Sequence, residues 1–360
     1  MARSISQIEA LVKQFATAVG FDLAGIAPAR LGDSRELRFF SEWIAGGRAG
    51  DMAYLESRDH HGRLKRASLE HVAPWARSVI VCALNYNTVH PRSTECHDPE
   101  RGWISRYAWG NTDYHGAVMK RLRQVEARLR KEVADPALET RCYVDTGPLV
   151  ERVFAVYAGV GWIGKNTCLI NQRVGSWLFL GVILTSLELT PDLPPPDRCG
   201  SCTRCLDACP TQAFVAPHEL NATRCISYLT IEKHGAIPEE LRPGMGNHVF
   251  GCDICQDVCP WNRKAPASSA PEFQPRPERL HPALAWLANL SEEDFRSAFR
   301  GSPIRRARHS GLRRNAAVAM GNSGERGFVP LLEQIACDPV PMVAEHAEWA
   351  LGRLHRKGET

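Results

Sequence analysis

The sequence has no long apolar run. Its longest apolar stretch, Trp177–Leu184, is far shorter than the roughly 20 residues that an α-helix needs to cross a bilayer. The first ten residues, Met1 to Ala10, contain no apolar core of the kind found in secretory signal peptides. These two absences favour a cytoplasmic protein without a membrane partner.

The charge balance is also weak. A net charge of +4 over 360 residues is too small to predict nucleic-acid binding by itself. The hydrophobic fraction of 44% suffices for a full core, and this length predicts two or three domains. Composition alone therefore indicates an ordinary globular protein and leaves its function open.

The cysteines, in contrast, are concentrated in one region. Residues 199–210 read CGSCTRCLDACP, which is the C-x2-C-x2-C-x3-C-P signature of bacterial ferredoxins. Residues 252–260 read CDICQDVCP and keep the later part of that signature. Val249 stands where the first cysteine of this second run would be, and the isolated Cys225 can take its place. Four plus four thiolates match the ligand count of two 4Fe–4S clusters.

In such a pair of runs, three closely spaced thiolates hold one cluster and the fourth serves the other cluster. Structural zinc is an alternative because C-x2-C also binds zinc, although zinc sites rarely use the full pattern. Disulfides are disfavoured because the spacing is tight and no export signal is seen. The predicted ligands are Cys199, Cys202, Cys205 and Cys259 for one cluster, and Cys209, Cys225, Cys252 and Cys255 for the other.

Three domains are expected from the composition along the chain. Residues 1–190 alternate helical and strand patterns, which predicts an α/β or α+β domain. A proline-rich linker, 191–197, opens a cysteine-rich module that we place at 191–265. A second segment rich in proline and serine, 264–282, precedes a C-terminal domain at 280–360. Within the first domain, helices are expected over 4–19, 35–57, 113–133 and 149–160, and strands over 21–27, 77–84, 141–145 and inside 173–189.

The C-terminal domain contains a repeat and a basic stretch. Asn315–Gly321 matches His346–Gly352 at a shift of 31 residues, which predicts two helical hairpins of HEAT type. Residues 276–314 hold nine arginines, no lysine and four acids. Arginine forks suit phosphate groups, so the stretch is either a nucleic-acid contact or a solvated helix face. The candidate contacts are Arg305, Arg306, Arg308, Arg313 and Arg314.

One acidic residue in the first domain is a candidate catalytic group. Asp145 ends a predicted strand, and Thr-Gly-Pro follows it. A carboxyl group buried at such a strand end would have a raised pKa and could deliver a proton. The alternative is an aspartate that only caps a turn. A polar and aromatic cluster, Tyr107 with Asp113–His115, either caps a helix or lines a pocket.

A glycine-rich segment, Gly159–Asn166, stands after the predicted helix 149–160. Its glycine spacing does not match a Walker A loop or a dinucleotide-binding fingerprint. Glycines without side chains could still let the backbone approach a bulky ligand. Lys165 and Asn166 could contact that ligand or could simply begin a helix.

Taken together, these motifs resemble the epoxyqueuosine reductases over nearly the whole chain. Two long segments are especially specific, RCISYLTIE at 224–232 and GAIPEELRP at 235–243. The other matching segments are SRYAWG at 105–110, DYH at 113–115, VD at 144–145, ER at 151–152, GWIGK at 161–165, both cysteine runs, GCD at 251–253 and CPWN at 259–262.

The resemblance implies an enzyme that reduces epoxyqueuosine to queuosine at the wobble position of tRNA, the last step of queuosine biosynthesis. Its substrates would be the tRNAs with GUN anticodons, those for Asp, Asn, His and Tyr. It would use cobalamin in the N-terminal domain, two 4Fe–4S clusters and an external electron donor. HEAT-like repeats would help to grip the tRNA through the arginine-rich stretch, and the expected state is a monomer.

The resemblance also assigns roles to single residues. Asp145 corresponds to the general acid of the family. This sequence departs from the family at Asn111–Thr112, where two residues stand between the glycine and the Asp-Tyr-His motif instead of one. The insertion bears on contacts from Ala108 to Tyr114. The residues expected to bind cobalamin are Arg66, Ala108, Asp145, Arg152, Lys165, Asn166 and Ser227.

Three other functions are compatible with parts of the sequence. A reductive dehalogenase that acts on a small molecule would share the cofactors, but the chain shows no Tat signal and has an arginine-rich C-terminus. A ferredoxin-like electron carrier would bind neither cobalamin nor tRNA. A protein that only holds tRNA would keep its role after Asp145→Ala.

Overall fold

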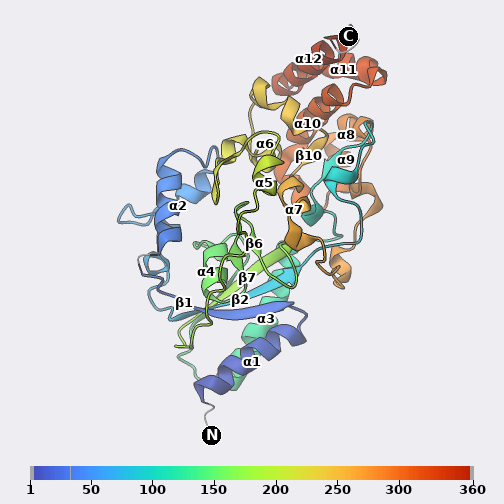
Figure 1. Ribbon diagram of the computed structural model, residues 1–360. Helices are drawn as coiled ribbons and strands as arrows, with labels where there is room; N and C mark the ends of the chain where they lie inside the picture. Colours follow the sequence, from blue (N-terminus) through green and yellow to red (C-terminus); the bar gives the residue numbers. More distant parts are fainter. Residues whose placement is uncertain (1–3, 33, 357–360) are drawn as a thin grey trace.

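A four-stranded antiparallel sheet forms the centre of the N-terminal part of the chain (Figure 1). The computed structural model describes residues 4–32 and 34–356. Every neighbouring pair of strands in this sheet is antiparallel. The pairing fits the α+β class and corrects the narrower expectation of an α/β domain. The strand order is β1 (Leu23–Pro28), β2 (Ser78–Asn85), β7 (Leu178–Thr185) and β4 (Thr140–Tyr143).

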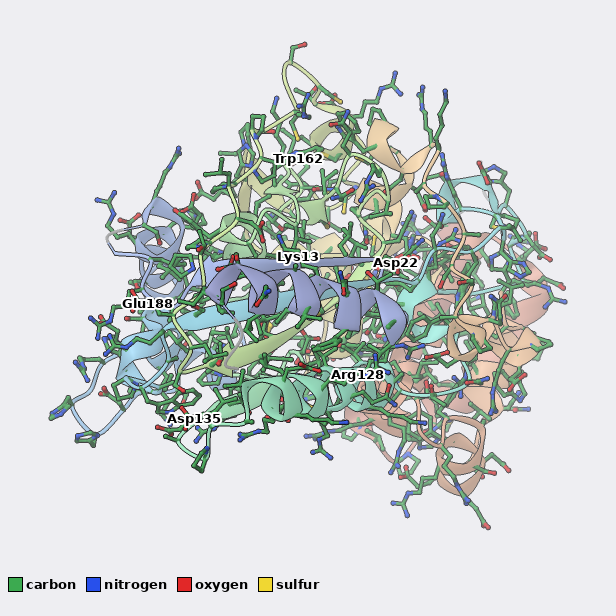
Figure 2. All side chains as sticks on the ribbon, turned by 90° about the horizontal axis from the view of Figure 1, so that it is seen from below. Lys13, Asp22, Arg128, Asp135, Trp162 and Glu188 are labelled. Carbon is green, nitrogen blue, oxygen red and sulfur yellow. The ribbon has the colours of Figure 1, made fainter. Side chains whose placement is uncertain are left out.

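Helices cover both faces of this sheet. Figure 2 shows α1 (Ile5–Ala18) beside α3 (Tyr114–Val133) on one face, and α4 (Glu151–Tyr157) packs on the other. The central strand β2 is buried along its whole length. Alternate residues of a strand point to opposite faces, so Ile80, Cys82 and Leu84 join the core with α1 and α3. Val79, Val81 and Ala83 join the core with α4.

Two smaller elements complete the N-terminal part. Helix α2 (Arg35–Ala45) stands apart from the sheet and begins at Ser34, whose hydroxyl accepts a hydrogen bond from the backbone of Leu37. The glycine-rich segment forms the hairpin of β5 (Trp162–Ile163) and β6 (Leu169–Ile170). Side chains of helix α2 line a large cavity of the protein.

The cysteine-rich module is built from short elements. Two four-residue helices, α5 and α7, lie inside the two cysteine runs and contact each other. Strand β10 pairs in parallel with β3 (Trp103–Ile104) of the N-terminal part, so the module is joined to that part by backbone hydrogen bonds. The elements of the module are α5 (Arg204–Asp207), β8 (Phe214–Ala216), β9 (Glu219–Leu220), α6 (Ile226–Ile231), β10 (His248–Phe250) and α7 (Ile254–Asp257).

The C-terminal region is helical and lies at the opposite end of the molecule from α1 (Figure 1). Helix α10 packs against both α8 and α12, and α11 packs against α12. Among the described residues, no helix is both long and apolar enough to cross a membrane. The outermost residues of the expected terminal domains, 1–3 and 357–360, lie outside the described part. The five helices are α8 (Leu284–Asn289), α9 (Glu292–Ala298), α10 (Arg308–Ser323), α11 (Val329–Ala336) and α12 (Pro341–Arg356).

The first residue of each repeated motif attaches its helix to the cysteine-rich module. Asn315 on α10 donates from Nδ2 to the carbonyls of Thr230 (2.9 Å) and Val249 (2.8 Å). His346 on α12 accepts from the backbone N–H of Ile237 at 3.1 Å. Both side chains are fully buried. The two copies of the repeated motif therefore lie on α10 and α12, and each places its first, polar residue against the cysteine-rich module.

Candidate active site

The first predicted set of cysteines lies together in the structure. Burial raises the pKa of Cys205 to about 11, and the nearby thiolates of Cys259, Cys199 and Cys202 raise this pKa further. These four residues come from both cysteine runs, as the ferredoxin pattern requires. The fold therefore brings the first set of ligands within electrostatic reach of one another.

The second set is likewise gathered at one place. Burial raises the pKa of Cys252 well above its ordinary value, and thiolates at Cys225 and Cys209 add to this effect. A hydrogen bond with Cys168, burial, and the charges of Cys252 and Cys225 raise the pKa of Cys255. All thirteen cysteines are free thiols. Within residues 4–32 and 34–356, no three potential ligands surround a single-ion position.

A buried carboxylate holds the second cysteine run in place. Asp253 is 1% exposed and accepts hydrogen bonds from the Ser105 hydroxyl (2.5 Å), the Trp103 indole (3.1 Å) and the backbone of Arg106 (2.8 Å). Burial raises the pKa of Asp253, and these hydrogen bonds oppose the rise. Because Asp253 follows Cys252 directly, it fixes that ligand against the N-terminal part. The sequence predicted no role for Asp253, although the segment GCD at 251–253 that contains it resembles the epoxyqueuosine reductases.

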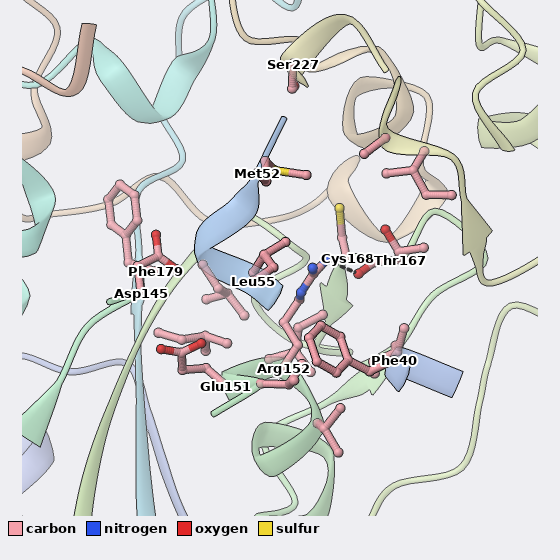
Figure 3. Close-up of a pocket in the computed structure, with 18 of the residues that line it drawn as sticks. Phe40, Met52, Leu55, Asp145, Glu151, Arg152, Thr167, Cys168, Phe179 and Ser227 are labelled. Atoms are coloured by element: carbon pink, nitrogen blue, oxygen red, sulfur yellow. Dashed lines mark hydrogen bonds between the residues drawn. The ribbon is translucent and has the colours of Figure 1, made fainter. Parts of the chain in front are cut away.

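A large cavity lies between the N-terminal part and the module (Figure 3). Its volume is about 2030 Å³, well above the roughly 300–1,000 Å³ of drug-sized pockets. Cys225 lines it, so the second cysteine set borders the cavity. Among the predicted site residues, those that line it are Arg66, Asp145, Arg152, Ser227, Arg305 and Arg306.

Three residues expected to bind the cofactor do not line this cavity. Ala108 is 1% exposed and belongs to a hydrophobic core. Lys165 donates from Nζ to the carbonyl of Gly200 at 2.7 Å, and Asn166 donates to the carbonyl of Cys255 at 3.3 Å. The last two side chains therefore support the two cysteine runs, which corrects their assignment as cavity residues.

The glycines near them are required by the fold. A Cβ atom at Gly161 would lie 2.3 Å from the carbonyl oxygen of Ile170, and one at Gly164 would lie 2.4 Å from the Ile170 side chain. The close approach is thus between β5 and β6. This approach explains the two glycines, and Trp162 and Ile163 of the same segment line the large cavity.

Asp145 lies at the cavity in a strained backbone turn. Its φ angle is +58°, and the backbone N–H of Thr146 donates to the carbonyl of Val144 at 2.6 Å. Such a conformation costs a non-glycine residue about 1–3 kcal/mol. The Asp145 side chain is 62% exposed, so the expectation of a buried carboxyl group is wrong. Its carboxylate accepts from the Tyr114 hydroxyl, which the turn-capping alternative does not explain.

The predicted cluster of polar and aromatic residues surrounds this carboxylate. His115 Nε2 lies 3.9 Å from Asp145 Oδ2, and His115 Nδ1 lies 2.7 Å from Asp113 Oδ1. Burial alone would lower the pKa of His115, but the hydrogen bond to Asp113 and the charges of Asp113 and Asp145 raise it. The Tyr114 ring stacks on Phe179 with centroids 4.3 Å apart. Asp145 thus has both a hydroxyl donor and a neighbouring imidazole.

The one-residue insertion at Asn111–Thr112 does not disturb this arrangement. Asn111 and Thr112 are exposed, and the backbone N–H of Asn111 donates to the carbonyl of Glu272 at 3.0 Å. Helix α3 begins directly afterwards, with Asp113 as its N-cap. Tyr114 therefore still reaches Asp145.

A second acid of the cavity was missed by sequence reasoning about single residues. Glu151, the first residue of α4, lines the cavity. Burial and, to a smaller extent, the charge of Asp145 raise the pKa of Glu151 to about 7. In the sequence, Glu151 appeared only in the short segment ER at 151–152, which is one of the segments that resemble the epoxyqueuosine reductases. A glutamate at the start of a helix is common because its charge is stabilised by the helix dipole. Only its burial in the folded protein therefore distinguishes Glu151 from other glutamates.

The five candidate arginines separate into two groups. Arg305, Arg306 and Arg308 are exposed, and the first two line the cavity. Arg313 instead bonds Asp338 at 2.5 Å. Arg314 is 0% exposed and donates to the carbonyls of residues 229, 233 and 235. Because Arg314 has no access to solvent, its assignment as a nucleic-acid contact is wrong.

The cavity mouth carries an aromatic residue between two cations. The guanidinium groups of Arg66 and Arg306 lie 5.8 and 5.2 Å from the centroid of the Tyr54 ring. Tyr54 is 45% exposed, and Arg306 also pairs with Glu232 at 2.6 Å. This mouth presents positive charge and an accessible ring.

Two gathered sets of four cysteines beside a large cavity with a carboxylic acid define an iron–sulfur redox protein. Residues 198–262 match the family model of a 4Fe–4S double cluster binding domain, which favours iron over the zinc alternative. Residues 66–146 match the model described as epoxyqueuosine reductase QueG.

Full-length relatives agree with these matches. An epoxyqueuosine reductase of Pseudomonas aeruginosa is 42% identical over 355 residues, 97% of this chain and 94% of that protein. A crystal structure of epoxyqueuosine reductase with an epoxyqueuosine-modified tRNA-Tyr stem loop is 32% identical, with a TM-score of 0.85 over 98% of this chain and 91% of that one. The chain belongs to the epoxyqueuosine reductase family, a family of oxidoreductases.

A further solved relative carries information about the catalytic aspartate of the family. An epoxyqueuosine reductase of Bacillus subtilis, solved with its catalytic aspartate loop swung out of the active site, is 31% identical to this chain. Its TM-score is 0.85 over 98% of this chain and 91% of that one. Family membership decides against the dehalogenase and electron-carrier alternatives.

Proposed function

We propose that this chain reduces epoxyqueuosine to queuosine at the wobble position of tRNA, as the last step of queuosine biosynthesis. The observation that carries this proposal is the placement of Asp145 in a cavity that the cluster ligand Cys225 also lines. An acid and an electron source thereby meet at one site. The relative solved with an epoxyqueuosine-modified stem loop indicates the substrate.

We also propose cobalamin as the third cofactor. The cavity of about 2030 Å³ has the size for a ligand much larger than a typical coenzyme, and Arg66, Arg152 and Ser227 supply polar groups on its wall. These residues fit a large ligand with many amide groups. When bound, cobalamin supplies a reduced cobalt centre that can act on the epoxide carbon.

The chain's own residues then perform three tasks. The eight predicted cysteine ligands would hold two clusters, which would supply single electrons from an external donor beside the cavity. Tyr114 donates a hydrogen bond to Asp145 and so orients this carboxyl group. Asp145 delivers a proton to the epoxide oxygen. The strained turn at Asp145 supports the idea that its loop moves, as the Bacillus subtilis structure shows for that relative.

The tRNA is proposed to bind at the cavity mouth and along the C-terminal helices. Arg305, Arg306 and Arg308 are exposed there and suit backbone phosphates, and bases of a single-stranded loop can stack on an aromatic ring such as Tyr54. We propose GUN anticodons as the targets, a monomeric cytoplasmic enzyme, and HEAT-type hairpins for α10 to α12. The proposed domains are 1–190, 191–265 and 280–360.

The direct test is anaerobic reconstitution followed by a turnover assay. The loaded protein should contain about eight iron atoms and one cobalt atom per chain. Given a chemical reductant and epoxyqueuosine-containing tRNA, it should yield queuosine, detected by mass spectrometry of the digested nucleosides. Bound iron and cobalt without queuosine formation would contradict the proposed substrate. Iron without cobalt uptake would contradict the cofactor.

A further inference from the structure

The proposed reduction consumes two protons, and the inference below rests on that proposed function. An epoxide oxygen is bonded to two carbons. When it leaves as water, both carbon–oxygen bonds break, and two electrons and two protons are taken up. The electrons arrive through the clusters and form the carbon–carbon double bond of the product. Asp145 accounts for one of the two protons.

A second carboxyl group lies in the wall of the same cavity. Glu151 and Asp145 are both among the lining side chains drawn in Figure 3, and residues 146–150 connect them. The Oε1 atom of Glu151 is buried, and within the described residues it has no hydrogen-bond partner. A buried carboxylate oxygen that lacks a donor is unfavourable, whereas the neutral acid loses little on burial. The surroundings of Glu151 therefore favour its protonated form.

We propose that Glu151 is the second acid of the active site and gives the second proton to the oxygen that leaves the epoxide. Asp145 and Glu151 each lose one proton, the oxygen departs as water, and solvent reprotonates both carboxylates between turnovers. This makes Glu151 a catalytic residue with a role separate from that of Asp145.

The charges around Glu151 fit this role. The pKa of Glu151 is raised to about 7, with burial as the largest cause and the negative charge of Asp145 as the second. A backbone hydrogen bond and the positive charges of Arg66 and Arg152 act in the opposite direction. An exposed glutamate has a pKa of about 4.3 and is almost fully ionised at neutral pH. Glu151 instead keeps a large protonated fraction there.

The test compares Glu151→Gln with the wild-type holoenzyme, because glutamine keeps the size of the side chain but lacks the acidic proton. In single-turnover reactions on epoxyqueuosine tRNA, the wild-type rate should fall as the pH rises through about 7. The variant should be about 10²-fold slower, as is typical after loss of a general acid, and should lose this pH dependence. Its affinity for the tRNA should remain within about twofold.

Two further variants separate chemistry from structure. Glu151→Asp restores an acid and should recover part of the rate together with the pH-dependent fall. Glu70→Gln is the matched control, because Glu70 pairs with Arg30 at 2.8 Å outside the cavity. It should behave as wild type in rate and in pH profile.

An infrared measurement provides a result that does not depend on turnover. Difference spectra of the wild-type protein should show a protonated carboxyl band that disappears as the pH rises through about 7. Glu151→Gln should lose the part of this band that belongs to Glu151, and the part that remains belongs to Asp257, whose pKa burial also raises to about 7. Glu70→Gln should retain it.

The results of these experiments distinguish a failure of the proposed role of Glu151 from a failure of the proposed function. A Glu151→Gln enzyme with wild-type rate and pH profile would overturn the proposal. A variant that loses cobalamin while the infrared band keeps its full intensity would also overturn it, since Glu151 would then only hold the cofactor. If the wild-type holoenzyme itself forms no queuosine, the proposed function fails instead, and the infrared result still reports on Glu151.

Discussion

At the scale of the residue, Asp145 shows how an exposed carboxyl group can still be singled out by its surroundings. The structure places its carboxylate against the Tyr114 hydroxyl and near His115. The backbone at Asp145 has a left-handed conformation, with φ of +58°, which is strained for a residue with a side chain, and Asp145 lines the cavity. Strain of this kind is commonly kept at functional positions.

The first prediction concerns this acid. Asp145→Asn should reduce turnover by about 10²-fold or more, because the amide cannot deliver a proton, while tRNA binding stays unchanged. Single-turnover assays and a binding titration on the same preparation would measure both. Normal turnover of the variant would rule out Asp145 as the acid.

The second prediction concerns the buried His346. Its ring accepts from the Ile237 N–H and bonds the Met342 carbonyl at 2.6 Å, so only the neutral ring fits. Burial lowers its pKa to about 4, against about 6.5 when unfolded. The unfolded state therefore binds the proton first, and the stability present above about pH 6.5 is lost as the pH falls toward about 4.

Thermal unfolding over this pH range would measure the effect. His346→Gln keeps an acceptor for Ile237 but cannot be protonated, so its stability should fall less than that of the wild type between about pH 6.5 and pH 4. His248, whose pKa burial also lowers to about 4, remains in the variant and leaves a residual decline. Identical pH dependence in both proteins would contradict the assignment.

At the scale of the element, helix α10 and the short 3-10 turn before it, Pro303–Ala307, carry two kinds of arginine. Arg305 and Arg306 precede it on the surface, whereas Arg314 lies inside it and bonds backbone carbonyls around α6. The charge pattern in the sequence is the same for both groups. The two groups differ because Arg314 faces the cysteine-rich module, whereas Arg305 and Arg306 face solvent.

The third prediction contrasts these two groups. Arg314→Met removes the donors of three carbonyls and should destabilise the protein by about 3 kcal/mol or more, since each buried unpaired group costs about 1–3 kcal/mol. Arg305→Ala should change stability by less than about 0.5 kcal/mol and should weaken tRNA binding. Denaturant unfolding and tRNA titration at several salt concentrations would measure the two effects. A loss of tRNA affinity that does not depend on salt would contradict a phosphate contact for Arg305.

At the scale of the whole molecule, the cysteine-rich module connects the two ends of the chain. Strand β10 pairs with β3, Asp253 receives three hydrogen bonds from residues 103–106, and Asn315 and His346 bind the module from the other side. The clusters thus lie where the N-terminal and C-terminal parts meet.

The fourth prediction follows from this position. Cys255→Ser should lower the iron content from about eight to about four atoms per chain and should also weaken cobalamin binding, because the second cysteine set borders the cavity. Metal analysis and a cobalamin titration would show both effects. Cys337→Ser is the control, since Cys337 is exposed and outside the two sets.

Much of the local structure follows from the sequence alone. The expected strand at 77–84 and helix at 113–133 are confirmed as β2 and α3, because a continuous apolar run and a helical period are local signals. Family membership confirms the resemblance. The ferredoxin pattern predicts that Cys259 joins the first cysteine set, and in the structure the charge of Cys259 reaches Cys205.

Burial could be decided only by the tertiary structure. Arg314 is buried because it meets carbonyls more than 75 residues earlier in the chain, and no local pattern encodes such contacts. The same holds for the exposure of Asp145 and for the raised pKa of Glu151, which depends on burial and on the neighbouring charges. The sequence by itself determined the family and the presence of a 4Fe–4S double cluster domain, because spacing and motif are properties of the chain. The fold decided which charged residues reach substrate, because desolvation and long-range contacts exist only once the chain is packed.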